Sequence, residues 1–225
     1  MKDNSGSDQL GHAWFMTKLK NLVGKTILDF GSGSEAGFGR ILARHGFNVI
    51  CVDIQPPRLP ERLPNLHYMQ GNFLDIFPET SVGIVGDDSK WADILPFGVD
   101  IIVNLSSIEH AGLVGRYGSK DDPDQDLKVM KIMRNYINPD GFHLLHIPIG
   151  IDNTIGFYHR IYGEKRLPKL LEGWEIEEEA YWRKNDDNIY VQTDKETCLK
   201  EKATYPISLF PRYYAVGCFK LRIAK

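Results

Sequence analysis

The chain has 225 residues, 42% of them hydrophobic and 25% charged, a composition typical of one globular α/β domain with a full core. We therefore expect residues 1–225 to form a single domain. A net charge of −3 provides no positive field for a phosphate backbone, which disfavours nucleic acid as a partner. The chain lacks a run of about 18 apolar residues and an apolar core near its start, so we expect no membrane span and a cytoplasmic location.

The pattern of apolar and turn-forming residues predicts a series of strands and helices. The first helix runs from about residue 8 to residue 20 and either covers a ligand site or packs on a sheet edge. Seven strands follow from the β-branched and alternating runs, over residues 27–30, 48–52, 66–70, 99–104, 142–147, 174–182 and 213–223. Further helices are expected over residues 37–45, 91–95, 123–138 and 167–171. The polar stretch 184–205 has no assigned element.

Residues 26–53 predict a strand, a glycine-rich loop, a helix and a second strand. The first apolar run stops at Gly31-Ser32-Gly33, and the second buried run ends in Asp53. In a doubly wound sheet the carboxyl ends of such strands border the ligand crevice. The glycines allow a sharp turn and a close backbone approach, and a carboxylate 20 residues after Gly33 can accept both hydroxyls of a ribose. This stretch therefore predicts a site for a nucleoside cofactor.

Two classes of cofactor fit this loop. The spacing over residues 31–36 matches the dinucleotide fingerprint, which would make the chain a nicotinamide-dependent dehydrogenase or epimerase. However, Asp29 before the glycines and Glu35 after them would repel an anionic pyrophosphate. S-adenosylmethionine carries a sulfonium and an ammonium, so Asp29 suits its amino acid end and Asp53 suits its ribose. The remaining interpretation is an ordinary βαβ unit with a solvated Asp53.

The segment Asp29-Phe-Gly-Ser-Gly33, followed by Asp53, resembles motifs I and II of class I S-adenosylmethionine-dependent methyltransferases. The resemblance implies an α/β, doubly wound, seven-stranded, mostly parallel sheet with an antiparallel last strand. It also implies a third motif at Asn72, where an acidic or amide side chain meets the adenine amino group. The chain departs from the family pattern at two positions. Asp is commoner than Asn at position 72, and a third glycine is common where this chain has Glu35. The implied cofactor-binding residues are Asp29, Gly31, Ser32, Gly33, Asp53, Ile54, Asn72, Phe73 and Asn104.

The second informative segment, residues 104–126, leaves the fourth predicted strand, whose end faces the transferable methyl group in this topology. Methyl transfer to oxygen requires alignment of acceptor and methyl and removal of the acceptor's proton. Histidine is the side chain best suited to that proton at neutral pH. We expect His110 to be the general base and Glu109 to orient it or a substrate hydroxyl. Alternatively, both residues begin a helix and face solvent or a structural hydrogen bond.

Three further histidines are candidates for the same site. His143 and His146 point to opposite faces of the fifth predicted strand, and His146, near its carboxyl end, is the better site residue. His159 follows in a loop that can reach over the acceptor, and we include it among the catalytic residues. Glu109, His110 and His159 would suit a divalent ion. Their spacing is not diagnostic, so we expect no metal.

A narrower resemblance covers roughly residues 100–180. Four short motifs occur in the order found in a methyltransferase-like family, domain of unknown function 268. They are Ser106-Ser-Ile-Glu-His110, Gly115-Arg-Tyr-Gly118, Pro148-x-Gly150 and His159-Arg-Ile-Tyr-Gly163. The family name brings no substrate with it. The resemblance implies that acceptor recognition involves Arg116, Tyr117, Arg160 and Tyr162. We add His146 to these substrate-binding candidates because of its position near the carboxyl end of its strand.

These patterns together favour an S-adenosylmethionine-dependent O-methyltransferase acting on a small polar acceptor, such as a sugar or another hydroxylated metabolite. A nicotinamide-dependent enzyme is one alternative, and a cofactor-binding scaffold without transfer chemistry is another. The departures at Glu35 and Asn72 leave the scaffold open, whereas the Glu109-His110 pair disfavours it. The sequence makes no prediction of oligomeric state.

Overall fold

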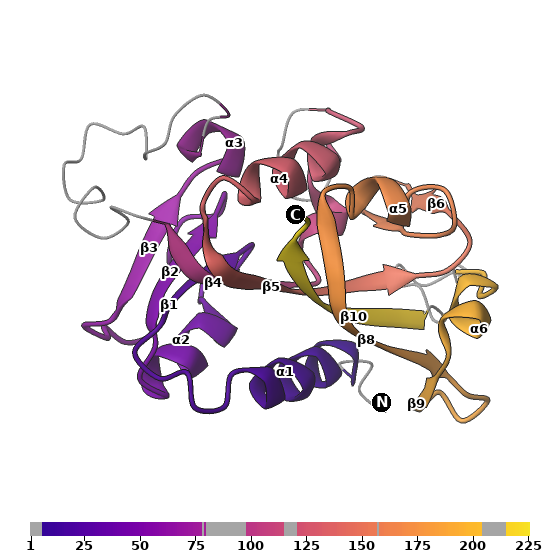
Figure 1. Cartoon of the computed structure of the whole chain (residues 1–225), viewed down its shortest axis with the longest axis horizontal. Coiled ribbons are helices and arrows are strands. Elements are labelled where there is room, and N and C mark those ends of the chain that lie inside the picture. The colour runs from indigo at the N-terminus through magenta and orange to yellow at the C-terminus, as the bar shows by residue number, and fades with distance from the viewer. Residues whose placement is uncertain (1–5, 78, 80–97, 115–120, 157, 204–214) are drawn as a thin grey trace.

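The computed structural model describes residues 6–77, 79, 98–114, 121–156, 158–203 and 215–225 (Figure 1). Its strands are β1 Thr26–Phe30, β2 Asn48–Asp53, β3 Leu66–Gln70, β4 Val99–Leu105, β5 Ile137–Ile149, β6 Asn153–Ile155, β7 His159–Ile161, β8 Trp174–Lys184, β9 Tyr190–Thr193 and β10 Ala215–Ile223. Its helices are α1 Gly6–Lys18, α2 Gly37–Arg44, α3 Phe73–Ile76, α4 Gln125–Met133, α5 Leu167–Leu170 and α6 Lys195–Leu199, with a 3-10 turn, η1, over Ile108–His110. The helix expected over residues 91–95 lies outside the described residues.

The described strands form a sheet of eight, in the order β3-β2-β1-β4-β5-β10-β8-β9, and a separate antiparallel pair, β6-β7. The strands β1 to β5 are parallel, whereas β10 is antiparallel to both β5 and β8. The expected mostly parallel α/β sheet with an antiparallel last strand is confirmed. The sheet has one strand more than the seven expected, because β9 pairs with β8 in the polar stretch that had no assigned element.

Helices cover both faces of this sheet, with α1 and α2 on one side and α3, α4 and α5 on the other (Figure 1). Side chains alternate between the two faces along each strand. In β1, Leu28 and Phe30 belong to the apolar cluster that contains the residues of α4, whereas Ile27 belongs to the cluster that contains Phe15 of α1 and Leu42 of α2. The two clusters are the two halves of the core of a doubly wound fold.

The start of β5 differs from the expectation. The helix predicted over residues 123–138 ends at Met133, and β5 begins at Ile137 instead of residue 142. The pairing of β5 with β4 jumps from Val99↔Ile137 to Ile101↔Phe142, so residues 138–141 form a bulge within the strand. A Cβ atom on Gly141 would lie 2.6 Å from the Asp100 carbonyl oxygen, which explains why the bulge contains a glycine.

The first helix lies on the sheet beside β4 and β5. A Cβ atom at Gly11 would lie 2.4 Å from Leu105 Cδ1 and 3.0 Å from His146 Cγ, so a glycine allows the helix to approach both strands. Phe15, one turn further along, is fully buried in the same layer. Among the described helices, none has the length and apolar character needed to span a membrane.

Candidate functional site

A cavity of about 300 Å³ opens at the carboxyl ends of β1, β2 and β4. This is the edge of a parallel sheet at which doubly wound folds bind their ligands. Among the residues expected to bind a cofactor, the cavity is lined by Gly31, Ser32, Gly33, Asp53, Ile54, Asn72 and Phe73. Its lining also includes polar residues that sequence reasoning did not propose, namely Asp8, Gln55, Ser106, Ser107 and Gln125.

The two glycines of the loop serve different purposes. Both have the left-handed backbone that favours glycine, with φ of 68° at Gly31 and 70° at Gly33. A Cβ atom on Gly31 would lie 2.3 Å from Ser107 Cβ, so this glycine lets the segment after β4 pack against the loop. A Cβ atom on Gly33 would have no protein atom within 4 Å. Gly33 therefore leaves space that a ligand can occupy.

Asp53 is held rigidly at the end of β2. Its Oδ2 accepts a hydrogen bond from the Gly33 N–H at 2.8 Å, and its Oδ1 accepts one from the Gln55 N–H at 2.8 Å. Each carboxylate oxygen has a second lone pair, so both can accept a further hydrogen bond from a ligand. The binding of two neighbouring hydroxyls by this carboxylate stays a prediction.

Asp29 and Asn104, both expected to contact a cofactor, lie outside the cavity lining. Asp29 is 2% exposed and faces α2, where it accepts a hydrogen bond from the Gly39 backbone and lies 3.9 Å from Cys51 Sγ. Burial raises the pKa of Asp29 to about 7. Asn104 is fully buried, and its Oδ1 accepts the N–H of Ile108 at 3.3 Å. Both side chains support the loops around the cavity instead of facing a ligand.

Asn72 lines the cavity, but its acceptor oxygen is already engaged. Asn72 Oδ1 accepts the backbone N–H of Leu74 at 3.0 Å and thereby caps α3. The same oxygen accepts a hydrogen bond from Gln125 Nε2 at 3.1 Å. The expected acceptance of an adenine amino group by Asn72 therefore conflicts with these contacts.

His110 is the predicted catalytic residue that lines the cavity. Its Nδ1 is hydrogen-bonded to the carbonyl oxygen of Tyr158. A carbonyl oxygen only accepts, so Nδ1 carries the hydrogen and, in the neutral ring, Nε2 carries the lone pair. Nε2 lies 3.9 Å from Glu109 Oε1, close enough for that buried carboxylate to stabilise a protonated ring.

Glu109 and His159, the other two predicted catalytic residues, lie behind His110 and do not line the cavity. Both are buried, and the His159 ring meets the His110 ring edge to face, with 5.9 Å between centroids. Over the residues that the structure describes, no three His, Cys, Asp or Glu side chains are arranged to hold a metal ion.

His146 reaches the cavity only through a serine. It is fully buried, and its Nδ1 lies 2.7 Å from the Oγ of Ser106, which does line the cavity. Burial lowers the pKa of His146 to about 4, so the ring is neutral at physiological pH. Ser106 has a φ of 50°, an unfavourable backbone conformation for a residue other than glycine. A direct acceptor contact by His146, expected from its position near the end of the strand, does not fit this burial.

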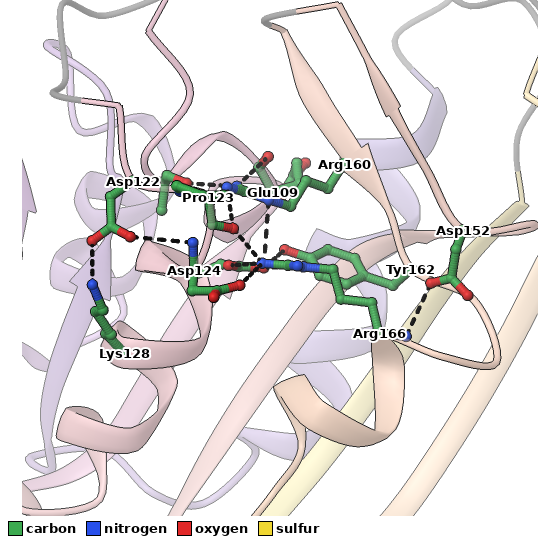
Figure 2. Close-up of polar contacts among 11 residues, drawn as sticks. Glu109, Asp122, Pro123, Asp124, Lys128, Asp152, Arg160, Tyr162 and Arg166 are labelled. Carbon is green, nitrogen blue, oxygen red and sulfur yellow. Dashed lines mark hydrogen bonds and ion pairs between the residues drawn. The ribbon is translucent and has the colours of Figure 1, made fainter.

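Arg160, predicted to recognise the acceptor, is instead a buried structural side chain. It is 2% exposed. Its Nη1 donates to the carbonyl oxygens of Ala111 and Glu109, and its Nη2 donates to that of Pro123 at 3.0 Å (Figure 2). The guanidinium therefore ties together the two ends of the segment between η1 and α4.

Tyr162 belongs to the same network and also lies outside the cavity lining. Its hydroxyl donates to Asp126 Oδ2 at 3.0 Å, and Arg166 Nε donates to the same oxygen at 3.0 Å (Figure 2). Asp126 is fully buried, with Arg160 Nε 3.7 Å away. The two remaining acceptor candidates, residues 116 and 117, fall outside the described residues.

The charge of the cavity is negative. Among the described lining residues there are two carboxylates, those of Asp8 and Asp53, and no lysine or arginine. Such a lining suits a cationic or hydroxyl-rich ligand and disfavours a dianion.

Solved structures identify the fold as that of class I methyltransferases. The 1,6-didemethyltoxoflavin-N1-methyltransferase of Burkholderia thailandensis, with bound 1,6-didemethyltoxoflavin and S-adenosylhomocysteine, is 13% identical, with a TM-score of 0.58 over 98% of this chain and 79% of that one. A TehB-like SAM-dependent methyltransferase from Corynebacterium glutamicum is 14% identical, with a TM-score of 0.54 over 95% and 88%. The YcgJ protein of Bacillus subtilis is 12% identical, with a TM-score of 0.54 over 96% and 100%.

The family is shown by the sequence itself. Residues 81–208, more than half of the chain, match the family described as "Caenorhabditis protein of unknown function, DUF268". The chain therefore belongs to the DUF268 family, as the motifs over residues 100–180 predicted. No curated protein matches the chain significantly.

Proposed function

We propose that the chain is an S-adenosylmethionine-dependent methyltransferase, acting as a single domain in the cytoplasm. The observation that carries this proposal is the Asp53 carboxylate, fixed by Gly33 and Gln55 at the mouth of a negatively charged cavity. Its two oxygens suit the two hydroxyls of a ribose, and the open space at Gly33 suits a ligand that passes close to the loop. When bound, S-adenosylmethionine supplies an electrophilic methyl group on a sulfonium.

The residues that disfavour a dinucleotide cofactor are not the ones expected from the sequence, Asp29 and Glu35. Asp29, on β1, is buried against α2, and Glu35 is exposed outside the cavity lining, so neither would meet a pyrophosphate. Asp8 and Asp53 are the carboxylates that line the cavity. Asp53 suits the ribose of either cofactor, so Asp8 is the carboxylate that disfavours the pyrophosphate of a nicotinamide cofactor and attracts a sulfonium or an ammonium.

Calorimetric titration with S-adenosylhomocysteine and, separately, with NAD tests the cofactor. We expect the former to bind and the latter not to bind. Asp53→Asn replaces an oxygen that accepts hydrogen bonds by an amino group that donates them. We expect this change to lower the affinity for S-adenosylhomocysteine by about tenfold or more. Asp186→Asn, an exposed position at the turn between β8 and β9, is the matched control. Binding of NAD alone would move the proposal to redox chemistry.

The acceptor we propose is a small polar molecule methylated on oxygen. A small acceptor is supported by the structural neighbour from Burkholderia thailandensis, which is crystallised with the small molecule 1,6-didemethyltoxoflavin. His110 supports hydroxyl chemistry, because its Nδ1–H is fixed by the Tyr158 carbonyl and its Nε2 is the nitrogen that can take a proton. With S-adenosylmethionine bound to supply the methyl group, Nε2 would take the hydroxyl proton of the acceptor oxygen that receives it. Glu109, 3.9 Å from that nitrogen, stabilises the resulting imidazolium.

A screen of sugars and hydroxylated metabolites with labelled cofactor tests this role. We expect His110→Asn to lower turnover by about 10²- to 10⁴-fold while the affinity for S-adenosylhomocysteine stays within a few-fold. His45→Asn is the matched control, because His45 Nδ1 also hydrogen-bonds a carbonyl, that of Ile41, at 2.8 Å, but lies outside the cavity lining. Full turnover in His110→Asn would show that His110 is not the general base. Binding without transfer to any acceptor would favour a scaffold.

A further inference from the structure

We propose that Gln125 on α4 selects the purine base of the ligand, and that it does so as one half of an amide pair with Asn72. This inference rests on the proposed function and deepens it at the same cavity. Both residues line the cavity, Asn72 just before α3 and Gln125 as the first residue of α4. They come from segments 53 positions apart in the sequence and meet through a single hydrogen bond.

The orientation of both amides follows from one backbone group. The Leu74 N–H is a donor, so the atom of Asn72 that it contacts at 3.0 Å must be the oxygen, Oδ1. The atom of Gln125 that contacts the same oxygen at 3.1 Å must then be the amino nitrogen, Nε2. What remains is the amino group of Asn72, a donor, and the Oε1 of Gln125, an acceptor.

These two remaining groups are available to a ligand. Neither Asn72 Nδ2 nor Gln125 Oε1 has a hydrogen-bond partner among the described residues, and neither is among the buried polar atoms that lack one. Both residues border the cavity. The pair therefore presents a donor and an acceptor next to each other at the wall of the ligand site.

A neighbouring acceptor and donor complement adenine. Its amino group at N6 donates and is flanked by ring nitrogens, N1 and N7, that accept, which is why asparagine and glutamine recognise adenine through two hydrogen bonds. Hypoxanthine carries a carbonyl oxygen in place of the amino group, and that oxygen would face the Gln125 oxygen. In this chain Asn72 thus contributes the donor, and the acceptor that the family resemblance assigned to it comes from Gln125.

The glutamine is held in place before any ligand binds. The residue is 7% exposed, and its backbone N–H donates to the Asp122 carbonyl at 3.0 Å. Gly112, with a φ of 73°, allows the close approach, because a Cβ atom there would lie 2.7 Å from Gln125 Cβ. A restricted side chain loses little freedom on binding and can discriminate between bases.

The test compares two probes by calorimetry: S-adenosylhomocysteine and S-inosylhomocysteine, in which a keto oxygen replaces the purine amino group. We expect the full chain to prefer the adenosyl compound by about 10- to 100-fold. Gln125→Leu removes both polar atoms at similar volume and should reduce that preference to less than about threefold. Gln192→Leu on β9 makes the same chemical change at an exposed site and should leave the preference unchanged.

A second variant tests the donor. Asn72→Asp keeps an oxygen for the Leu74 N–H but replaces the donor by an acceptor, so it should lower the affinity for the adenosyl probe and raise that for the inosyl probe. Two results would overturn the selection of adenine by Gln125 and leave the methyltransferase proposal standing. One is equal affinity of the unaltered chain for both probes, and the other is an unchanged preference in Gln125→Leu. Failure of the unaltered chain to bind either probe would overturn the proposed function and this inference with it.

Discussion

Replacing Asp126 by asparagine is expected to be strongly destabilising. The Asp126 carboxylate is fully buried and accepts hydrogen bonds from Tyr162 and Arg166, with Arg160 Nε at 3.7 Å (Figure 2). An amide of the same size has one acceptor oxygen instead of two and turns a donating amino group towards these donors. The Arg160 charge, 2% exposed, would then lack its counter-ion.

The expected magnitude follows from burial. Removing one partner of a buried ion pair costs about 3–5 kcal/mol. Water can compensate part of this at Arg166, whose side chain is 25% exposed, so we expect the lower end, about 3 kcal/mol. In a domain of this size that corresponds to a fall in Tm of about 6–12 °C.

The assay is urea and thermal unfolding at pH 7.5, followed by circular dichroism. Asp124→Asn is the matched control, because Asp124 also pairs with Arg166, at 3.3 Å, but its side chain is 60% exposed. An exposed pair contributes about 0–1 kcal/mol, so the control should unfold almost like the unaltered chain. If both variants lost the same small amount of stability, the reasoning from the burial of Asp126 would be refuted.

Two further predictions concern the glycine loop and β1. Gly31→Ala should lose more stability than Gly33→Ala, because both methyl groups occupy a left-handed backbone costing about 1–2 kcal/mol but only the first overlaps Ser107. Gly33→Ala should instead lower the affinity for S-adenosylhomocysteine measured by calorimetry. An unchanged affinity would show that Gly33 does not border the bound ligand. The pKa of Asp29 is about 7 in the folded chain and has its ordinary value of 3.8 in the unfolded chain, so the free energy of unfolding falls as pH rises through that window, by at most about 1.4 kcal/mol per pH unit. Asp29→Asn should remove this fall, and a variant-minus-parent difference in unfolding free energy that is equal at pH 5 and pH 8 would contradict it.

The parallel strands could be predicted because their signals are local. The expected runs 27–30, 48–52 and 66–70 coincide with β1, β2 and β3 to within a residue, since buried parallel strands are short apolar runs that stop at turn residues. The edge strand β9, over Tyr190–Thr193, has only four residues and an exposed Val191 and Gln192, so it lacks the apolar pattern that marks a strand.

The site was less predictable, because side-chain position depends on packing. The glycines and Asp53 follow from a motif, but Asp29 faces away from the cavity that its neighbour Phe30 lines, as strand alternation requires. No helix was expected over Phe73–Ile76, so the capping role of Asn72 was not predicted from the sequence. Its contact with Gln125 joins distant segments, and no local pattern indicates it.

The last strand in the sequence, β10, occupies an inner position of the sheet, between β5 and β8. Strands β1 to β5 can pair with one another using residues 26–149 alone, whereas the β8–β9 pair cannot join this sheet until residues 215–223 are present. The order of synthesis therefore allows the half of the sheet that borders the cavity to form first. A chain shortened before β10 would retain the strands around the cavity but expose the long edges of β5 and β8, and unpaired edges recruit other chains. We expect such truncation to cause aggregation before it destroys the ligand site.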